Sequence, residues 1–123
     1  MPRFHHANLG VPVDGIADEA AFLTDVLGYR RLEPPPELRD RANWFEGDDG
    51  RQIHLSVDPD HRPAARAHVA VEFGPELAAI EARLAERSIE FEAAEGVQGR
   101  VVICRDPAGN RWELRSTTEL AAP

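Results

Sequence analysis

One carboxylate near the end of the chain, Glu113, lies in a pattern that is typical of a half-buried strand. In the segment 111–115 (RWELR), Trp112 and Leu114 alternate with charged residues. The apolar side chains therefore face one side of the strand, and Glu113 faces the other side between two arginines. A carboxylate in such a place needs either water or a cation. We therefore treat Glu113 as a candidate metal ligand.

Three histidines occupy similar places in other predicted strands. They are His6 in the segment 4–11, His54 in the segment 52–57, and His68 in the segment 67–73. In each segment the apolar residues fall on one face and the histidine falls on the opposite face. Imidazole nitrogens and a carboxylate oxygen are suitable ligands for divalent zinc, nickel, manganese or iron. We expect these four residues to converge on one metal ion.

A site with three or four such ligands keeps positions for water or substrate, which is typical of a catalytic centre. Glu113 and His54 are the candidates to move a proton. His54 either ligates the metal or lies behind the ligands and shuttles the proton.

The elements that must position these residues occur twice along the chain. The first set is a strand at 4–11, a helix at 16–27, and strands at 29–33, 43–46 and 52–57; the second is a strand at 67–73, a helix at 76–87, and strands at 89–91, 100–105 and 111–115. His54 corresponds to Glu113 at an offset of 59 residues, as Gly50 does to Gly109, and His6 corresponds to His68 at an offset of 62. Such a repeat indicates two similar modules.

The predicted fold is α+β, with two βαβββ modules forming a curved mixed sheet, a cup with the helices outside. Module one spans about 3–58, the Pro- and Arg-rich linker spans 59–66, and module two spans about 67–117, within one domain of residues 1–123. Local signals mark the ends of elements. We expect Asp14 to cap the first helix, Gly28 to end it, the segment 48–50 to form a hairpin turn, and the segment 95–99 to form another turn.

Several further residues have a predicted role near the site or in the core. Specificity is expected to depend on Trp44, Arg100, Arg111 and Arg115. The two arginines beside Glu113 either grip an anionic substrate or balance charge. His5 shares a face with apolar residues and is expected to be structural, and Glu72 is either an exposed carboxylate or a base. Cys104, the single cysteine, is predicted to lie in the core and excludes a disulfide within the chain.

The composition limits the class of partner. The net charge of -8 argues against nucleic acid or an anionic membrane surface as the main partner. The sequence has no apolar run of about 18 residues and no secretory signal pattern at its N-terminus. We therefore expect a cytoplasmic protein whose partner is a small-molecule substrate.

Three motifs resemble the vicinal oxygen chelate superfamily, which includes glyoxalase I, the fosfomycin and bleomycin resistance proteins and the extradiol dioxygenases. The motifs are HANL at 6–9 followed by Val11-Pro12, FLTDVLGY at 22–29, and RDPAGNRWEL at 105–114, and the resemblance extends from Phe4 to about Ser116. It implies paired βαβββ modules around a divalent metal, with ligands from the first and last strands of each module. Those positions here are His6, His54, His68 and Glu113. The resemblance also implies a homodimer.

The same resemblance implies alternative functions. The first is a metal-dependent lyase or isomerase of the glyoxalase type, in which the metal binds two oxygens of a small substrate and stabilises an enediolate or alkoxide. Bacterial glyoxalase I proteins generally have Glu in place of His54, whereas the fosfomycin enzymes use two His and one Glu, matching His6, His68 and Glu113. The second is a small Fe(II) extradiol-type dioxygenase. The third is a drug-binding resistance protein whose loop 34–42 closes over its ligand.

Overall fold

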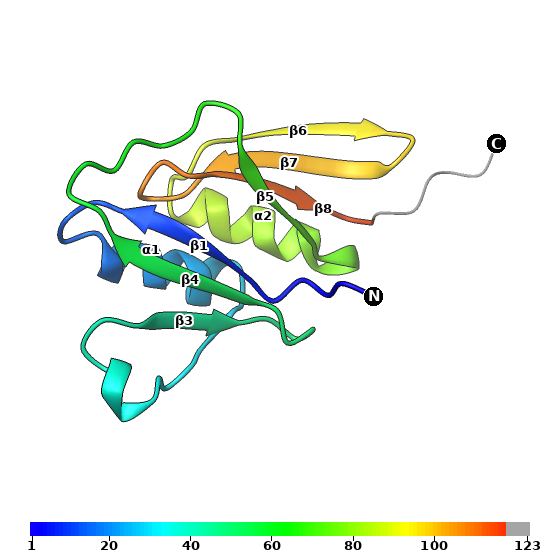
Figure 1. Cartoon of the computed structure of the whole chain (residues 1–123). Coiled ribbons are helices and arrows are strands. Elements are labelled where there is room, and N and C mark those ends of the chain that lie inside the picture. Colours follow the sequence, from blue (N-terminus) through cyan, green and yellow to red (C-terminus); the bar gives the residue numbers. More distant parts are fainter. Residues whose placement is uncertain (118–123) are drawn as a thin grey trace. The chain divides into compact units, whose positions relative to one another are not determined.

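The computed structural model describes residues 1–117 of the chain (Figure 1). The chain divides into two compact units, Met1–Pro63 and the residues from Ala64 onward. The division falls inside the segment 59–66 that we predicted to be a linker. Each unit contains one four-stranded mixed sheet and one main helix.

Unit 1 follows the predicted order of strand, helix and three strands. Its elements are β1 (His6–Val11), α1 (Ile16–Ala21), η1 (Phe22–Val26), β2 (Arg30–Arg31), η2 (Pro36–Leu38), β3 (Asn43–Glu46) and β4 (Gln52–Val57). The sheet order is β1-β4-β3-β2. β1 pairs with β4 in parallel, and β3 pairs antiparallel with both β4 and β2.

Unit 2 repeats this topology. Its elements are β5 (His68–Glu72), η3 (Gly74–Glu76), α2 (Leu77–Glu86), β6 (Phe91–Gly96), β7 (Gly99–Arg105) and β8 (Arg111–Arg115). The sheet order is β5-β8-β7-β6, with β5 parallel to β8. The predicted α+β class with two βαβββ modules is confirmed.

In each unit the apolar stripe of the helix packs on the apolar face of the sheet. The buried residues of unit 1 are Val11, Phe22, Leu23, Val26, Leu27, Phe45, Ile53 and Leu55. Those of unit 2 are Leu77, Ile80, Leu84, Val102, Cys104, Trp112 and Leu114. α2 lies across its sheet in Figure 1. Because side chains alternate along a strand, the histidines and Glu113 lie on the opposite, polar faces.

Four local predictions were wrong in detail. Asp14 does not cap α1: it has a positive φ of 66°, the N-cap is Gly15, and no side-chain cap bond forms. Val57, which the alternation in 52–57 puts on the apolar face with Ile53 and Leu55, is 50% exposed, since β4 ends there. The turn predicted at 95–99 is present but shorter: β6 extends to Gly96, β7 begins at Gly99, and residues 97–98 form the turn. Pro36 begins a short 3-10 turn, η2, within the segment 34–42 that we expected to be a loop.

Two other turn signals act as predicted. Gly28 has a φ of +86° and follows a helix whose last turn is π-helical, where the Leu27 amide donates to the Phe22 carbonyl. Gly50 has a φ of +81° in the hairpin between β3 and β4. Glycine adopts such angles without a steric penalty. No helix within residues 1–117 is long and apolar enough to cross a membrane.

The turn between β7 and β8 fixes the orientation of β8. Asp106 is 5% exposed; its Oδ1 accepts a bond from the Asn110 amide and its Oδ2 accepts one from the Trp112 indole, both at 2.9 Å. Trp112 is fully buried. The indole is thus held on the helix side of the sheet, and the next residue, Glu113, must face the other side.

We predict that Trp112→Phe destabilises the protein strongly. The substitution leaves a buried carboxylate oxygen of Asp106 without its indole donor, which costs about 1–3 kcal/mol of unfolding free energy, and a cavity adds to the loss. Urea unfolding measures this change. Trp44→Phe is the matched control, because Trp44 is only half-buried, and we expect it to cost less. Equal losses in the two variants would contradict the role given to the Asp106 bond.

Candidate metal centre

Glu113 lies in the middle of the polar face of the second sheet. β8 has β5 on one side and β7 on the other, and the register sets Glu113 between Ala70 and Ile103. These neighbours are small or apolar. The residues directly opposite the carboxylate on both neighbouring strands are therefore uncharged.

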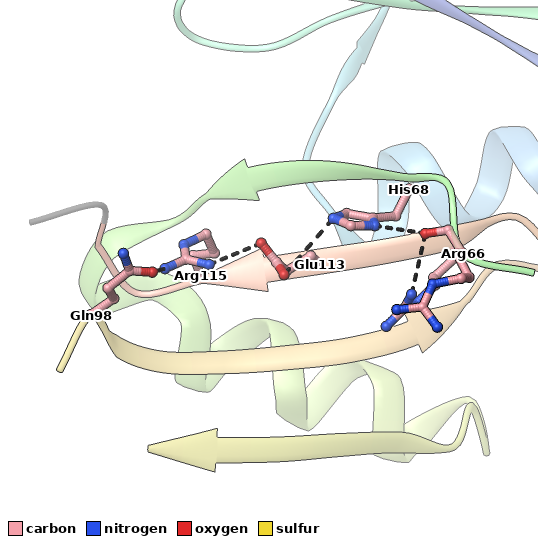
Figure 2. Close-up of polar contacts among 6 residues, drawn as sticks. Arg66, His68, Gln98, Glu113 and Arg115 are labelled. Atoms are coloured by element: carbon pink, nitrogen blue, oxygen red, sulfur yellow. Dashed lines mark hydrogen bonds and ion pairs between the residues drawn. The ribbon is translucent and has the colours of Figure 1, made fainter. Parts of the chain in front are cut away.

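His68 of β5 directs a ring nitrogen at this carboxylate (Figure 2). Its Nε2 lies 3.9 Å from Glu113 Oε1, and its Nδ1 lies 2.9 Å from the backbone carbonyl oxygen of Arg66. A carbonyl only accepts, so Nδ1 donates its proton in this pair and Nε2 is the ring nitrogen directed at Glu113. This tautomer is the one that a metal-ligating histidine adopts when its second nitrogen donates to a carbonyl.

The arginines beside Glu113 are engaged with the protein itself. Arg115 donates from Nη1 to Glu113 Oε2 at 2.9 Å and from Nη2 to Gln98 Oε1 at 2.6 Å. Arg111 donates from Nη1 to the Arg66 carbonyl at 3.2 Å. The carbonyl that orients His68 is therefore also bonded to Arg111. The sequence did not indicate a role for Gln98 or for the Arg66 carbonyl, because neither residue lies in an alternating strand pattern.

Unit 1 carries a row of stacked rings on its polar face. The His6 and His54 ring centroids are 3.9 Å apart at an interplanar angle of 13°, and those of Trp44 and His54 are 5.0 Å apart at 22°. These residues stand on β1, β4 and β3, which are neighbours in the sheet. The spacing of adjacent strands, about 4.8 Å, matches such a stack. The structure thus brings three predicted site residues together: His6, His54 and Trp44.

His54 is held by a second residue of its own strand. Its Nε2 lies 2.8 Å from Gln52 Oε1, two positions earlier on the same face. Burial, and to a smaller extent the positive charges of His6 and His5, lower the pKa of His54 below its ordinary value of 6.5. The imidazole is therefore neutral at neutral pH. The period-2 spacing of Gln52 and His54 was visible in the sequence and could have indicated this pair.

Two histidines outside the predicted set lie against residues of β1, His5 against His6 and His61 against Gly10. His5 was expected to be structural, on the core face; instead it is exposed, its Nδ1 lies 2.9 Å from His6 Nδ1, and its ring meets His6 edge-on. The reason is that β1 begins only at His6, so strand alternation does not govern His5. The imidazole of His61 lies against Gly10, where an added Cβ would be 2.9 Å from Nδ1.

Arg100 lies on the other face of the second sheet. It shares this face with Val102 and Cys104, which are buried beneath α2. Its guanidinium donates to both carboxylate oxygens of Glu81 on α2, at 2.9 and 2.6 Å, and to Glu95 at 3.0 Å. Arg100 thus ties the helix to the sheet and does not lie beside Glu113.

The four predicted ligands form two pairs, His6 with His54 in unit 1 and His68 with Glu113 in unit 2. Within residues 1–117, no three His, Cys, Asp or Glu side chains gather into a metal-binding group. The donors of each pair nevertheless suit a divalent ion. Imidazole nitrogens and a carboxylate oxygen are donors that zinc, nickel, manganese and iron accept.

The comparisons with known proteins agree with the fold. The model of the Glyoxalase/Bleomycin resistance protein/Dioxygenase superfamily matches residues 3–114. A glyoxalase family protein from Bacillus anthracis is 26% identical, with a TM-score of 0.81 over 93% of each chain. A glyoxalase/dioxygenase from Nostoc punctiforme is 25% identical, with a TM-score of 0.78 over 95% of this chain and 92% of that one. No curated protein matches the chain significantly.

A more distant structure has the same fold. The fosfomycin resistance protein FosX from Listeria monocytogenes is 18% identical, with a TM-score of 0.75 over 95% of this chain and 91% of that one. At this identity, the similarity of FosX to this chain shows only that the two share a fold. The match of the family model over most of the chain, with the repeated βαβββ units, shows that this protein belongs to the Glyoxalase/Bleomycin resistance protein/Dioxygenase superfamily.

Proposed function

We propose that this protein is a metal-dependent, glyoxalase-like enzyme that acts on a small substrate through two of its oxygens, in a lyase or isomerase reaction. The observation that carries the proposal is the His68–Glu113 pair, whose Nε2 and Oε1 face each other at 3.9 Å. The His68 side chain is 36% exposed, so contact with solvent alone would not fix its tautomer. Here the Arg66 carbonyl fixes it, which is what a ligand requires.

The proposed ligands are His6, His68 and Glu113, with His54 either as a fourth ligand or as a group behind them. They occupy corresponding places in the two repeats, on the polar face of each sheet. Members of this superfamily typically use divalent metals, which supports a metal here. When bound, such an ion supplies Lewis acidity that polarises an oxygen of the substrate. We also propose that the chain pairs with a second copy.

Two residues are proposed to move the proton. Glu113 is a carboxylate that lies 22% exposed, so solvent and a small substrate can reach it. His54 is neutral because its pKa is lowered, so it can accept a proton near neutral pH. The Trp44 and His6 rings on either side keep its orientation. Of the predicted substrate-binding residues, Trp44 keeps that role in this proposal, and Arg100 does not because Glu81 and Glu95 hold it.

We predict that the purified protein holds about one divalent metal ion per chain and that Glu113→Gln holds much less. Glutamine keeps the shape of the side chain but loses the anionic oxygen that the metal binds. Elemental analysis of protein prepared without chelator measures the content.

Glu72→Gln is the matched control for this experiment. Glu72 is an exposed carboxylate on the same face of the same sheet, opposite Arg115 in the register, and we expect its substitution to leave the metal content unchanged. A parent protein without metal would reject the proposal in favour of a ligand-binding resistance protein. Iron as the main metal, together with oxygen uptake in the presence of catechols, would favour the dioxygenase alternative instead.

We predict a pH dependence of stability that originates at His54. The pKa of His54 is lower in the folded protein than its ordinary value of 6.5, so the unfolded chain binds the proton more tightly. The folded state is therefore fully favoured above pH 6.5 and loses stability as the pH falls below it. Urea unfolding of the metal-free protein between about pH 7 and about pH 5 measures the loss.

His54→Gln is the variant that tests this origin, and it should lose less stability over the same range. Ser56→Ala, on the same face of β4, is the control without a titrating group and should keep the parent's dependence. The same pH dependence in His54→Gln and in the parent would show that other groups cause it.

A further inference from the structure

The carboxylate of Glu113 is held on the side away from His68 by a guanidinium. Arg115 lies two residues later on β8 and therefore on the same face. Its Nη1 donates to Glu113 Oε2 at 2.9 Å, while Oε1 is the oxygen that faces His68 Nε2. The two oxygens of one carboxylate thus have different partners, and the bond to Arg115 determines which oxygen faces the histidine.

The guanidinium is itself fixed from behind. Arg115 Nη2 donates to Gln98 Oε1 at 2.6 Å, and Gln98 lies in the tight turn between β6 and β7. The Arg115 side chain is only 14% exposed. A cation with so little exposure is costly unless it is paired and hydrogen-bonded. With one terminal nitrogen on Glu113 and the other on Gln98, Arg115 satisfies both conditions within unit 2.

We propose that Arg115, held by Gln98, is a positioning residue that fixes Glu113 with Oε1 toward His68. Arg111 has a corresponding positioning role for His68. Its Nη1 donates to the Arg66 carbonyl, which fixes the His68 tautomer. Figure 2 shows the row from Gln98 through Arg115, Glu113 and His68 to Arg66. Arg115 thus orders the proposed site and does not bind an anionic substrate. This inference rests on the proposed metal-dependent function.

The direction in which metal affinity changes when Arg115 is replaced distinguishes a positioning role from simple charge balance. A positive charge beside the site repels a divalent cation, so if Arg115 acted only through its charge, its removal would tighten metal binding. If it positions the carboxylate, its removal weakens metal binding by about 10–100-fold, the usual cost of losing a group that orients a ligand. The two roles predict changes of opposite direction.

The experiment is a titration of the metal-free protein with zinc in the presence of a competing chelator. Arg115→Met should weaken binding. Arg115→Lys should also weaken it, because one ammonium cannot reach both Glu113 and Gln98 although it keeps the charge. Gln98→Ala keeps Arg115 and Glu113 and should weaken binding less. Arg62→Met, the same change of charge at an exposed position of unit 1, is the control and should leave zinc affinity unchanged.

Unchanged or tighter zinc binding by Arg115→Met and Arg115→Lys would overturn the proposal while leaving the metal site intact. Thermal unfolding of each variant checks the fold, and Gln98→Ala keeps the test valid if the Arg115 variants do not fold. If the parent binds no zinc, the proposed function fails. Nitrogen NMR of the Arg115 guanidinium in the metal-free protein then tests whether Gln98 holds this side chain. Slow rotation of the guanidinium in the parent, and faster rotation in Gln98→Ala, would support the positioning of Arg115 by Gln98. Fast rotation in both proteins would reject it.

Discussion

The buried indole of Trp112 is the interaction on which the second sheet and its site depend. Its bond to Asp106 closes the turn before β8, and its burial with Leu114 beneath α2 fixes which side of the strand faces the core. Since side chains alternate, Glu113 can then only face the polar side. A strand shifted by one residue would bury the carboxylate and expose the indole, which is why this register is so strongly specified.

The polar faces of the two units are organised differently although their topology is the same. In unit 2, hydrogen bonds set the geometry: Arg115 holds Glu113, and the Arg66 carbonyl holds His68. In unit 1, the contacts are mostly between ring faces, with His54 between His6 and Trp44. Burial and the neighbouring His6 and His5 lower the pKa of His54, which suits a group that accepts protons, while a fixed carboxylate suits a ligand. One arrangement of strands thus carries two differently organised polar faces.

Much of the fold could be predicted because its signals are local. The alternation in 52–57 and 111–115 gave strands with the right faces, and the repeat offset gave the βαβββ order. The errors fall where local rules meet the end of an element. His5 lies before β1 begins, and Val57 lies where β4 leaves its sheet, so alternation predicts the wrong environment for both. The turn predicted at 95–99 is shorter, at 97–98, because β6 pairs with β7 along its whole length up to Gly96.

The sequence by itself determined the two repeats, the elements, and the faces on which His6, His54, His68 and Glu113 lie, since each depends on periodicity within a short segment. Only the tertiary structure decided the partners of the arginines. Arg100, Arg111 and Arg115 look alike in the sequence, yet the first binds Glu81 of α2, the second a backbone carbonyl, and the third Glu113 and Gln98. Long flexible cations reach whichever acceptor the strand register and the helix packing bring near, and that acceptor usually lies far away in the chain.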